Sequence, residues 1–446
     1  MPDDPELAPG RPELPMRLTR LRVKNFRSIA DIDIPLSPLT VLVGPNGSGK
    51  SNVVDALRFV RDVFARGLDQ AVINSERDLQ RWGSGKKGIS IGVTMRLASR
   101  EIDGAFTTES EIINRSVEWP ASTVSYDFTI NNHPENGSFV VEAETISIDL
   151  QSRGIGEINL KRTNALINIS FEGNTWKEVK LDHNMSRSEL LLPDGIVKLG
   201  GLHYFPDNGG SKLESQAWFI HFRYQAEYFK DEVIKQLFYK FNPANFRQPQ
   251  RFLKETHLDE EGHNLAAVLR RLSLSNNVNW ENLRFALRQA VTGFDALEVE
   301  QVGGYLATKL IYQTDTMQPR ASYLGQESDG TIRMLGILAA LYQDPAQPFL
   351  SIEEPEANIH PGALAVLASV LDEASLRGQV LVTTHSPDML DHLPAESFLV
   401  VEKVGDTTHV GPLDASQLAS VRKRLFTPGE LLRMEGLQRQ ADTTAA

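Results

Sequence analysis

The sequence contains no cysteine among its 446 residues. Disulfide bonds, thiolate zinc sites and cysteine nucleophiles are therefore excluded. It also lacks an uninterrupted apolar run of about 18 residues, which is what a membrane-spanning helix needs. The first residues, "MPDDPELAPGRPELP", are acidic and rich in proline, unlike the apolar core of a secretory signal peptide. We therefore expect a cytoplasmic protein without a membrane partner.

The chain also has fewer positive than negative side chains: 46 lysines and arginines against 58 aspartates and glutamates, which gives a net charge of −12. This balance argues against a protein that coats nucleic acid over its whole surface, but it leaves room for a local basic patch. Two short basic clusters, "RQPQR" and "VRKR", are open to two interpretations, a DNA contact or ordinary solvated surface. DNA therefore enters as a candidate partner.

The remaining composition is that of a globular protein, with 41 % hydrophobic residues and a length sufficient for about two to three domains. Apolar residues alternate with period two in "ISIGVTMRL" and "VSYDFTI", and they recur at helical spacing in "NLAAVLRRL". Near the C-terminal end, strands alternate with helices, which is typical of a parallel α/β sheet. We predict an α/β fold: a mixed or parallel sheet with flanking helices, an inserted antiparallel β region and a helical subdomain.

The same patterns divide the chain into six parts. We expect a disordered tail at 1–15, an N-terminal lobe at 16–100, the antiparallel β region at 101–210, the helical insertion at 211–296, a C-terminal lobe at 297–435, and a second tail at 436–446. Within the insertion, the apolar spacing of "QAWFIHFRYQAEYFKDEVIKQLFYKF" predicts a helix, and its aromatic residues favour core packing over a base-stacking platform.

The stretch "GPNGSGKS" matches the pattern G-x-x-x-x-G-K-[ST], with an apolar strand before it and a helical pattern after it. Glycines let the backbone curl so that its N–H groups point at phosphates, and the start of the helix adds a favourable field. Lys50 would reach the β- and γ-phosphates, and the Ser51 hydroxyl would bind Mg²⁺. The predicted nucleotide-binding residues here are Gly44, Pro45, Asn46, Gly47, Ser48, Gly49, Lys50, Ser51 and Asn52.

Two further motifs follow apolar strands. In "PFLSIEEPEANIHP", Glu353 would hold Mg²⁺ and Glu354 would polarise the attacking water. Because adjacent residues on a strand point to opposite faces, we expect the two carboxylates to divide these roles. In "VLVTTHSPDML", His385 stands just past a strand, where an imidazole would contact the γ-phosphate.

The stretch "GQESDGTIRMLG" is by itself open to two interpretations, a turn before an apolar helix or half of an active site. The order of "GPNGSGKS", "SDGT", "IEEPEANIHP" and "TTHSP" resembles that of the ABC-class ATPases of the SMC/RecF/OLD group. The likeness is greatest to compact AAA-type ATPases of bacterial phage-defence and toxin–antitoxin operons. "LRVKNFRSIADIDIPL" and "LDEEGHNLAAVLRRL" also look like segments of that group, so the resemblance covers roughly residues 17–435.

The resemblance implies a P-loop ABC-type ATPase head that uses ATP and Mg²⁺. Residues 44–51 would be the Walker A loop, Glu353 the Walker B acid, Glu354 its catalytic neighbour, 355–361 the D-loop region and His385 the switch histidine. Glu353 departs from the aspartate of many ABC ATPases. The signature residues would be Ser328, Asp329 and Gly330, which bind the γ-phosphate of a nucleotide held by a second subunit. The family thus implies an ATP-dependent, head-to-tail homodimer.

Three assignments stay open. Gln80 is either the Q-loop glutamine or a solvated loop residue. Lys24, Asn25 and Arg27 either approach the nucleotide or are ordinary charges at a strand end. The "GHNL" of residues 262–265 is either a ligand loop or a helix start with Asn264 near its N-cap.

The spacing between the motifs limits the functions that the chain could have. A compact insertion separates Lys50 from Ser328, and about 60 residues follow His385. We therefore expect no TOPRIM nuclease of the kind that full OLD proteins carry. We expect an ATPase that acts in DNA-related genome maintenance or anti-phage defence with a separate effector, a nuclease or a toxin. The alternative is a nucleotide-switched sensor or scaffold, in which ATP binding holds a complex together and turnover is slow or incidental.

Overall fold

The computed structural model describes residue 14 and residues 16–75, 78–81, 87–107, 112–119, 121–132, 138–150, 154–161, 166–171, 174–180, 225–248, 250–251, 257–275, 278–313 and 318–441. Most of the predicted N-terminal tail, and residues 216–224 of the long aromatic stretch, lie outside the described residues. Among the helices that are described, none combines the length and the apolar character needed to cross a membrane.

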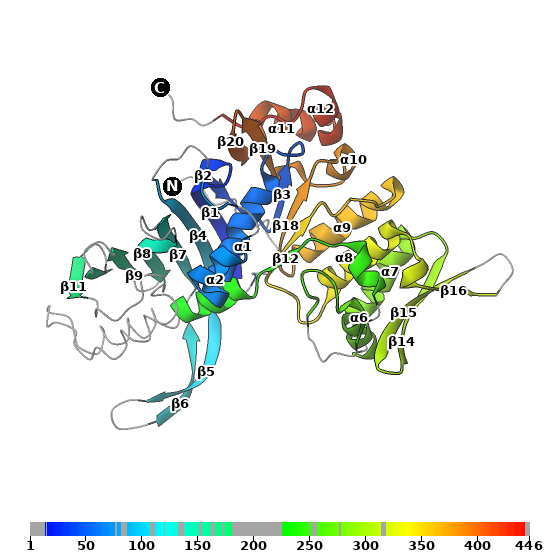
Figure 1. Cartoon of the computed structure of the whole chain (residues 1–446), viewed down its shortest axis with the longest axis horizontal. Coiled ribbons are helices and arrows are strands. Elements are labelled where there is room, and N and C mark those ends of the chain that lie inside the picture. Colours follow the sequence, from blue (N-terminus) through cyan, green and yellow to red (C-terminus); the bar gives the residue numbers. More distant parts are fainter. Residues whose placement is uncertain are drawn as a thin grey trace.

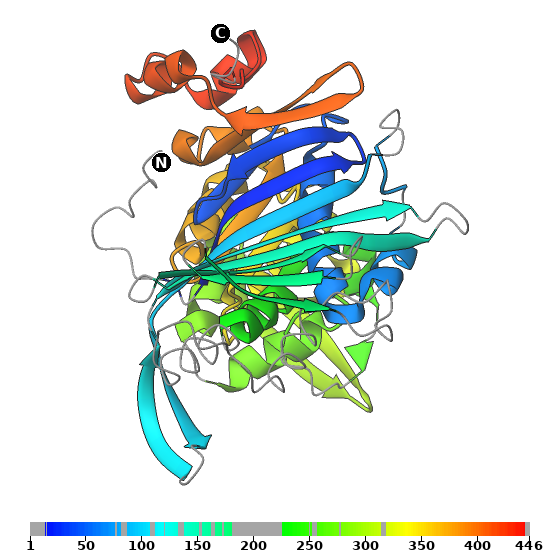
Figure 2. The same ribbon diagram turned by 90° about the vertical axis from the view of Figure 1, so that its left-hand side faces the viewer.

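A 14-stranded mixed sheet runs through the molecule in the order β11-β10-β9-β8-β7-β4-β1-β2-β20-β19-β3-β18-β17-β12 (Figures 1 and 2). Its strands are β1 (Met16–Phe26), β2 (Ile29–Pro35), β3 (Leu39–Val43), β4 (Ile89–Leu97), β7 (Ser122–Asn132), β8 (Phe139–Leu150), β9 (Gly154–Lys161), β10 (Leu166–Phe171), β11 (Asn174–Lys180), β12 (Leu237–Tyr239), β17 (Phe349–Glu353), β18 (Gln379–Thr384), β19 (Phe398–Val404) and β20 (Thr407–Pro412).

The parallel part of the sheet is β19-β3-β18-β17-β12, in which every neighbouring pair runs in the same direction. Every residue of β3, β17 and β18 is buried. Helices cover both faces there, so these strands read as continuous apolar runs rather than as alternating ones. Because the strands are parallel, their carboxyl ends lie at one edge of the sheet, and the residues that follow β3, β17 and β18 meet at that edge.

The predicted antiparallel β region continues this sheet instead of standing apart from it. β4 pairs with β1, and β7 pairs with β4, all antiparallel. The side chains of β7 alternate between buried and half-buried, as expected for a strand with one face on the core. A separate two-stranded hairpin, β5 (Arg100–Thr107) with β6 (Ile112–Trp119), projects from the body of the molecule in both views.

The helices that are described over their whole length are α1 (Lys50–Arg66), α2 (Leu68–Ile73), α5 (Pro243–Arg247), α6 (Leu265–Leu274), α7 (Val278–Ala290), α8 (Asp329–Tyr342), α9 (Leu364–Ala374), α10 (Pro387–Leu390), α11 (Ala415–Arg422) and α12 (Pro428–Met434), with 3₁₀ turns at Leu324–Gln326, Pro361–Ala363 and Ala395–Ser397. Alternate residues of β3 enter two different cores. Leu42 packs with α1 on one face, whereas Val41 and Val43 pack with α8 and α9 on the other. The result is the predicted α/β architecture, with helices on both sides of the sheet (Figure 1).

A small second sheet is built from β13 (Gln250–Arg251), β14 (Phe294–Val302), β15 (Tyr305–Tyr312) and β16 (Arg320–Tyr323). Its pairs are antiparallel, and β14 contacts α6 and α7. In Figure 1 it lies beyond α6 and α7, at the end of the molecule opposite β11.

One helix prediction was wrong in part. The aromatic stretch is helical over residues 225–234, but Leu237–Tyr239 forms β12, which pairs in parallel with β17. Phe238 and Tyr239 are both buried, one in each of the two cores. Two adjacent side chains enter opposite faces of a sheet only in a strand, so tertiary packing overrides the local helical spacing.

Gln379 joins two distant parts of the sheet. Its side-chain amide accepts a hydrogen bond from Leu18 N and donates to Leu18 O and Ser37 O, at 2.7–2.9 Å, and the side chain is buried. We expect Gln379→Leu to lower the free energy of unfolding by about 2–3 kcal/mol, since it strands buried backbone groups. Urea denaturation measures this. The control Gln70→Leu, at an exposed position of α2, should change the unfolding free energy little; equal effects would contradict the assignment.

Candidate active site

The predicted phosphate loop, residues 44–49, connects β3 to α1. Gly49 has φ 107°, in the left-handed region, and a Cβ there would lie 2.1 Å from Thr408 Oγ1. That hydroxyl donates to Ser48 O at 2.9 Å. Only glycine satisfies both the backbone angle and the close approach, so the glycine spacing of the motif has a direct steric cause.

Lys50, the first residue of α1, is buried against this loop. Its Nζ donates to the carbonyl oxygens of Gly44 and Pro45, at 2.7 and 3.0 Å. Burial lowers the pKa of Lys50 below its usual range, whereas the nearby carboxylates of Glu354 and Glu356 raise it. The ammonium group is thus held at the loop by backbone oxygens and by the field of two acids.

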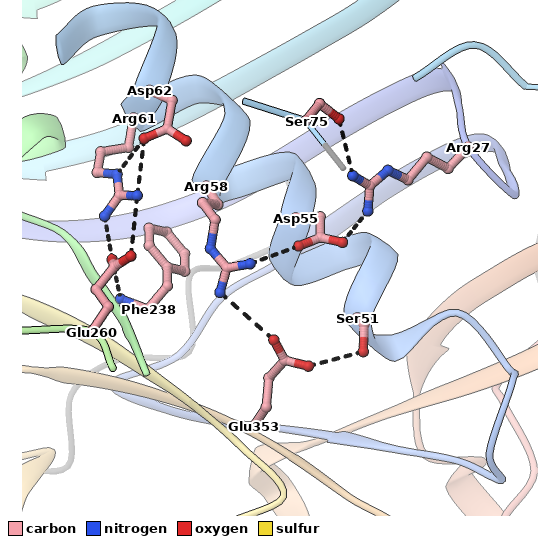
Figure 3. A network of polar contacts seen from close by, with 10 residues as sticks. All are labelled: Arg27, Ser51, Asp55, Arg58, Arg61, Asp62, Ser75, Phe238, Glu260 and Glu353. Carbon is pink, nitrogen blue, oxygen red and sulfur yellow. Dashed lines mark hydrogen bonds and ion pairs between the residues drawn. The ribbon is translucent and has the colours of Figure 1, made fainter. Parts of the chain in front are cut away.

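Ser51 and Glu353 meet at the carboxyl end of β17. The hydroxyl of Ser51 donates to Glu353 Oε2 at 3.0 Å, and the Glu353 side chain is only 10 % exposed (Figure 3). A hydroxyl and a carboxylate held together are the oxygen ligands that Mg²⁺ prefers, with the remaining positions left for water and phosphate. The residues present therefore fit the magnesium ion that the sequence predicts.

Glu354 adopts a left-handed backbone conformation, with φ 46°. Its N–H donates to both the carbonyl and the hydroxyl oxygen of Thr383, at 3.0 and 3.1 Å. The two carboxylates have different partners, Ser51 for Glu353 and His385 for Glu354. β17 ends at Glu353, so Glu354 lies in a left-handed turn and not, as expected, in the strand. A non-glycine residue in this region is strained, and such strain is characteristic of functional sites.

His385 lies next to Glu354, because β18 stands between β3 and β17 in the sheet. Its Nδ1 is 3.4 Å from Glu354 Oε1. His385 also lines a hollow of about 470 Å³ together with Gly44, Pro45 and Asn46 of the phosphate loop. The strand order therefore brings the phosphate loop, Glu354 and His385 to one edge of the sheet.

Ser328 lies elsewhere. It is the N-cap of α8, and its Oγ accepts a hydrogen bond from Thr331 N at 3.2 Å. It lines a hollow of about 480 Å³ with Gly330, Asn358 and His360, and no residue of the phosphate loop takes part in this hollow. Asp329, which the sequence also placed in the site, pairs with Arg247 at 2.6 Å. The signature candidate thus faces a different hollow from the phosphate loop of the same chain.

Gly330, in the first turn of α8, contacts the segment that follows Glu354. A Cβ on Gly330 would lie 2.2 Å from Asn358 O, and Asn358 itself has φ 63°. The first turn of α8 can therefore pack directly on the 355–361 backbone only because residue 330 is glycine.

Sequence reasoning missed Arg333, which stands one and a half turns into α8. It is 7 % exposed, and it donates to the carbonyl oxygens of Phe241, Glu353 and Glu354 at 2.9, 3.1 and 2.7 Å. Burial lowers the pKa of Arg333, and Glu356 and Glu354 raise it. An arginine inside the apolar run "TIRMLGILAALY" was the available signal, because an arginine is seldom buried without partners.

Glu356 was missed as well. It is 9 % exposed, and it accepts a hydrogen bond from the Thr384 hydroxyl at the end of β18. Its charge favours the charged forms of both Lys50 and Arg333. Glu356 thus supplies negative charge to the two buried cations of the site.

The open assignments are placed as follows. Gln80 Oε1 accepts from Asn132 on β7, at 2.7 Å, and so its amide is engaged with the antiparallel part of the sheet. Lys24 pairs with Asp31 on the surface, and Asn25 donates to Gly88 O. Arg27 pairs with Asp55 of α1 (Figure 3).

Asn264 is the N-cap residue of α6, as the helix-start interpretation requires. Its side chain closes the preceding loop instead of capping the helix, since it accepts from Asp259 N and donates to His257 O, at 2.9 and 2.7 Å. The segment is therefore held together by its own polar groups.

Comparison with known proteins finds one family model that matches residues 39–391, well over half of the chain. It is described as "AAA domain, putative AbiEii toxin, Type IV TA system". Among curated proteins, the OLD nuclease of Thermus scotoductus is 58 % identical over 43 residues, which is 10 % of this chain and 8 % of the nuclease. The DNA replication and repair protein RecF of Erwinia tasmaniensis is 38 % identical over 100 residues, 20 % of this chain and 28 % of RecF. The matches thus span well under two thirds of these relatives.

Solved structures with a similar arrangement include an SMC head bound to the C-winged helix domain of ScpA. It is 13 % identical, with a TM-score of 0.48, over 90 % of this chain and 99 % of that one. The SMC head domain of Thermotoga maritima is 15 % identical, with a TM-score of 0.37, over 90 % of this chain and 100 % of that one. Both TM-scores are below 0.5, so membership of a family rests on the sequence match.

The contacts of Arg333 lead to a prediction. Arg333→Met removes the donors that hold the Glu353 and Glu354 carbonyls, so the turn at Glu354 loses its support. We expect the kcat for phosphate release from ATP to fall by about 100-fold, the cost of misplacing a reacting group by about 1 Å, with KM for ATP nearly unchanged. Steady-state kinetics measures both.

Arg377→Met is the matched control, since Arg377 also donates to a carbonyl, Leu341 O, but lies away from the site. Arg333→Lys should recover part of kcat. A rise in KM with unchanged kcat would contradict this role for Arg333.

Proposed function

The chain belongs to the AAA-domain family described above and is an ATPase of the SMC/RecF/OLD type, and on that premise we propose that it binds ATP between two copies of itself and hydrolyses it. The observation that carries the proposal is that two pairs of interacting side chains lie at the same edge of the sheet. Ser51 with Glu353 makes a metal-binding pair, and Glu354 with His385 makes a pair suited to proton transfer. Both pairs adjoin the glycine loop that holds Lys50.

Each side chain has a role that its contacts support. Lys50, already donating to two carbonyl oxygens, would exchange these for phosphate oxygens of similar geometry. Ser51 and Glu353 would hold Mg²⁺, which neutralises phosphate charge when it is bound. Glu354, with its side chain 40 % exposed, would orient and deprotonate the attacking water. His385 would contact the γ-phosphate from the next strand and restrain Glu354.

A second copy is needed to complete the site. The proposed signature residues, Ser328 and Gly330, line a hollow that does not include the phosphate loop. Their helix, α8, presents its N-terminus to that hollow, and this end attracts phosphate. A head-to-tail homodimer would place each signature against the nucleotide of the other subunit.

For the biological setting, we propose DNA-related genome maintenance or anti-phage defence, with a separate effector protein. The names of the relatives, an OLD nuclease and a DNA replication and repair protein, and the toxin–antitoxin description of the family support this setting. The dimer would couple ATP turnover to the effector or to DNA.

Substitution at Glu354 tests hydrolysis. Glu354→Gln keeps the shape and removes the base, so we expect ATP binding to persist while phosphate release falls by about 100-fold or more. Lys50→Ala should abolish binding as well, and Glu281→Gln, on the exposed side of α7, should leave both unchanged. Measurements are Mg²⁺-dependent phosphate release and equilibrium ATP binding.

Equal phosphate release from Lys50→Ala and the unmodified protein would refute the site. If Glu354→Gln lost turnover but kept its biological activity in the cell, the sensor or scaffold interpretation would replace the enzymatic one.

Substitution at Ser328 tests the dimer. Ser328→Arg places a bulky side chain in the signature hollow, so we expect ATP binding by each subunit to remain, whereas ATP-dependent dimerisation and turnover are lost. Light scattering with ATP in the Glu354→Gln background reports the dimer. Ser275→Arg, at the exposed end of α6, is the control and should dimerise normally. A Ser328→Arg protein that dimerises with ATP would exclude the trans arrangement.

A further inference from the structure

We propose that Arg58 is a positioning residue for the magnesium-side carboxylate, one that neutralises Glu353 and restrains it from binding free divalent metal. The proposal rests on the function proposed above, because it takes Ser51 and Glu353 as the metal ligands. Arg58 would act through Glu353 and not by touching nucleotide, so that metal enters the site efficiently only together with ATP.

The first observation is the alignment of side chains on α1. Ser51, Asp55 and Arg58 are spaced four and then three residues apart, which places them on one face of the helix. Figure 3 shows this face turned toward Glu353, with all three side chains in one chain of polar contacts. The helix that begins at the phosphate loop therefore carries both a metal ligand and the cation that competes with the metal.

The second observation is how the two oxygens of Glu353 are shared. Oε2 accepts from Ser51 Oγ at 3.0 Å, while Oε1 lies 3.6 Å from Arg58 Nη2. A nearly buried carboxylate requires a compensating partner, and Arg58 is the ion-pair partner that the described residues provide. The separation of 3.6 Å exceeds that of a hydrogen bond. Arg58 thus supplies charge to Glu353 without occupying the oxygen that faces Ser51.

The third observation is that Arg58 is itself held in place. Its Nη1 donates to Asp55 Oδ1 at 3.0 Å, and its guanidinium lies 5.5 Å from the ring centre of Phe238. Asp55 is in turn paired with Arg27, which also donates to Ser75 Oγ at 3.3 Å. These contacts hold the guanidinium beside Glu353, so it cannot retreat freely when another cation approaches.

The positive charge of Arg58 opposes the binding of a metal ion at Glu353. A divalent cation bound to Glu353 and Ser51 would lie close to a fixed guanidinium, and the repulsion is stronger in a partly buried site than in water. The phosphates of ATP bring enough negative charge to outweigh that repulsion, whereas water does not. Removing the charge of Arg58 should therefore strengthen the binding of metal alone.

The experiment uses the full chain without nucleotide and Mn²⁺ as the probe, with free Mn²⁺ measured by electron paramagnetic resonance. We expect Arg58→Met, of similar length and without charge, to lower the Kd for Mn²⁺ by about tenfold. Arg58→Lys, which keeps the charge, should stay close to the unmodified protein. Should Arg58→Met fail to fold in a thermal melt, Arg58→Gln takes its place.

Two further variants define the site of the effect. Arg61→Met is the matched control, because Arg61 lies on the same helix, 5.1 Å from the centre of the same Phe238 ring, but pairs with Asp62 and Glu260. Its Mn²⁺ affinity should be unchanged. Adding Glu353→Gln to Arg58→Met should abolish the gain.

A Kd for Mn²⁺ that is unchanged or weaker in Arg58→Met would overturn the proposal, as would an equal gain in Arg61→Met. Failure of the proposed function is a separate result. It would appear as phosphate release that survives Lys50→Ala, whereas the metal titration contains no ATP and does not depend on turnover.

Discussion

The parallel pairing of three buried strands is the constraint on which the candidate site depends. β18 stands between β3 and β17, and each pair runs in the same direction, so the segments after the three strands meet at one edge. Every residue of these strands is buried, which fixes their register. Glycine loop, carboxylates and histidine come from widely separated parts of the chain, and strand pairing alone brings them together.

The candidate site also contains several buried charged side chains. Lys50, Arg333 and Glu353 are all nearly excluded from water, and each is compensated by backbone carbonyls or by an ion pair rather than by solvent. Compensated groups of this kind keep a fixed geometry but remain close in energy to alternatives in which a ligand takes over a partner. In the function proposed above, Lys50 would exchange its carbonyl contacts for phosphate oxygens with little reorganisation.

The sequence allowed the α/β architecture and the family to be predicted, because glycine spacing, apolar strands and carboxylates after strands are local patterns with direct physical causes. The partners of residues that act through long-range contacts could not be predicted, even where a residue such as the arginine within an apolar run stood out. Arg333 matters because it reaches the carbonyls of Glu353 and Glu354, and Arg58 because helix periodicity turns it toward β17. The left-handed turn at Glu354 and the strand at Leu237–Tyr239 are likewise imposed by neighbours that are distant in the sequence.

The close approach of Gly330 to Asn358 O has a mechanical consequence. Because the contact is between backbone atoms, a shift of the first turn of α8 would be passed directly to the segment after Glu354. A ligand bound at the first turn of α8 would therefore also act on the other end of that segment, next to Glu354, the general base proposed above. By thermodynamic reciprocity, if a ligand at the signature hollow changed the affinity of a ligand beside Glu354, the second ligand would change the affinity of the first by the same factor. The absence of a Cβ at residue 330 would thus couple ligand binding at the two ATP sites of the proposed dimer.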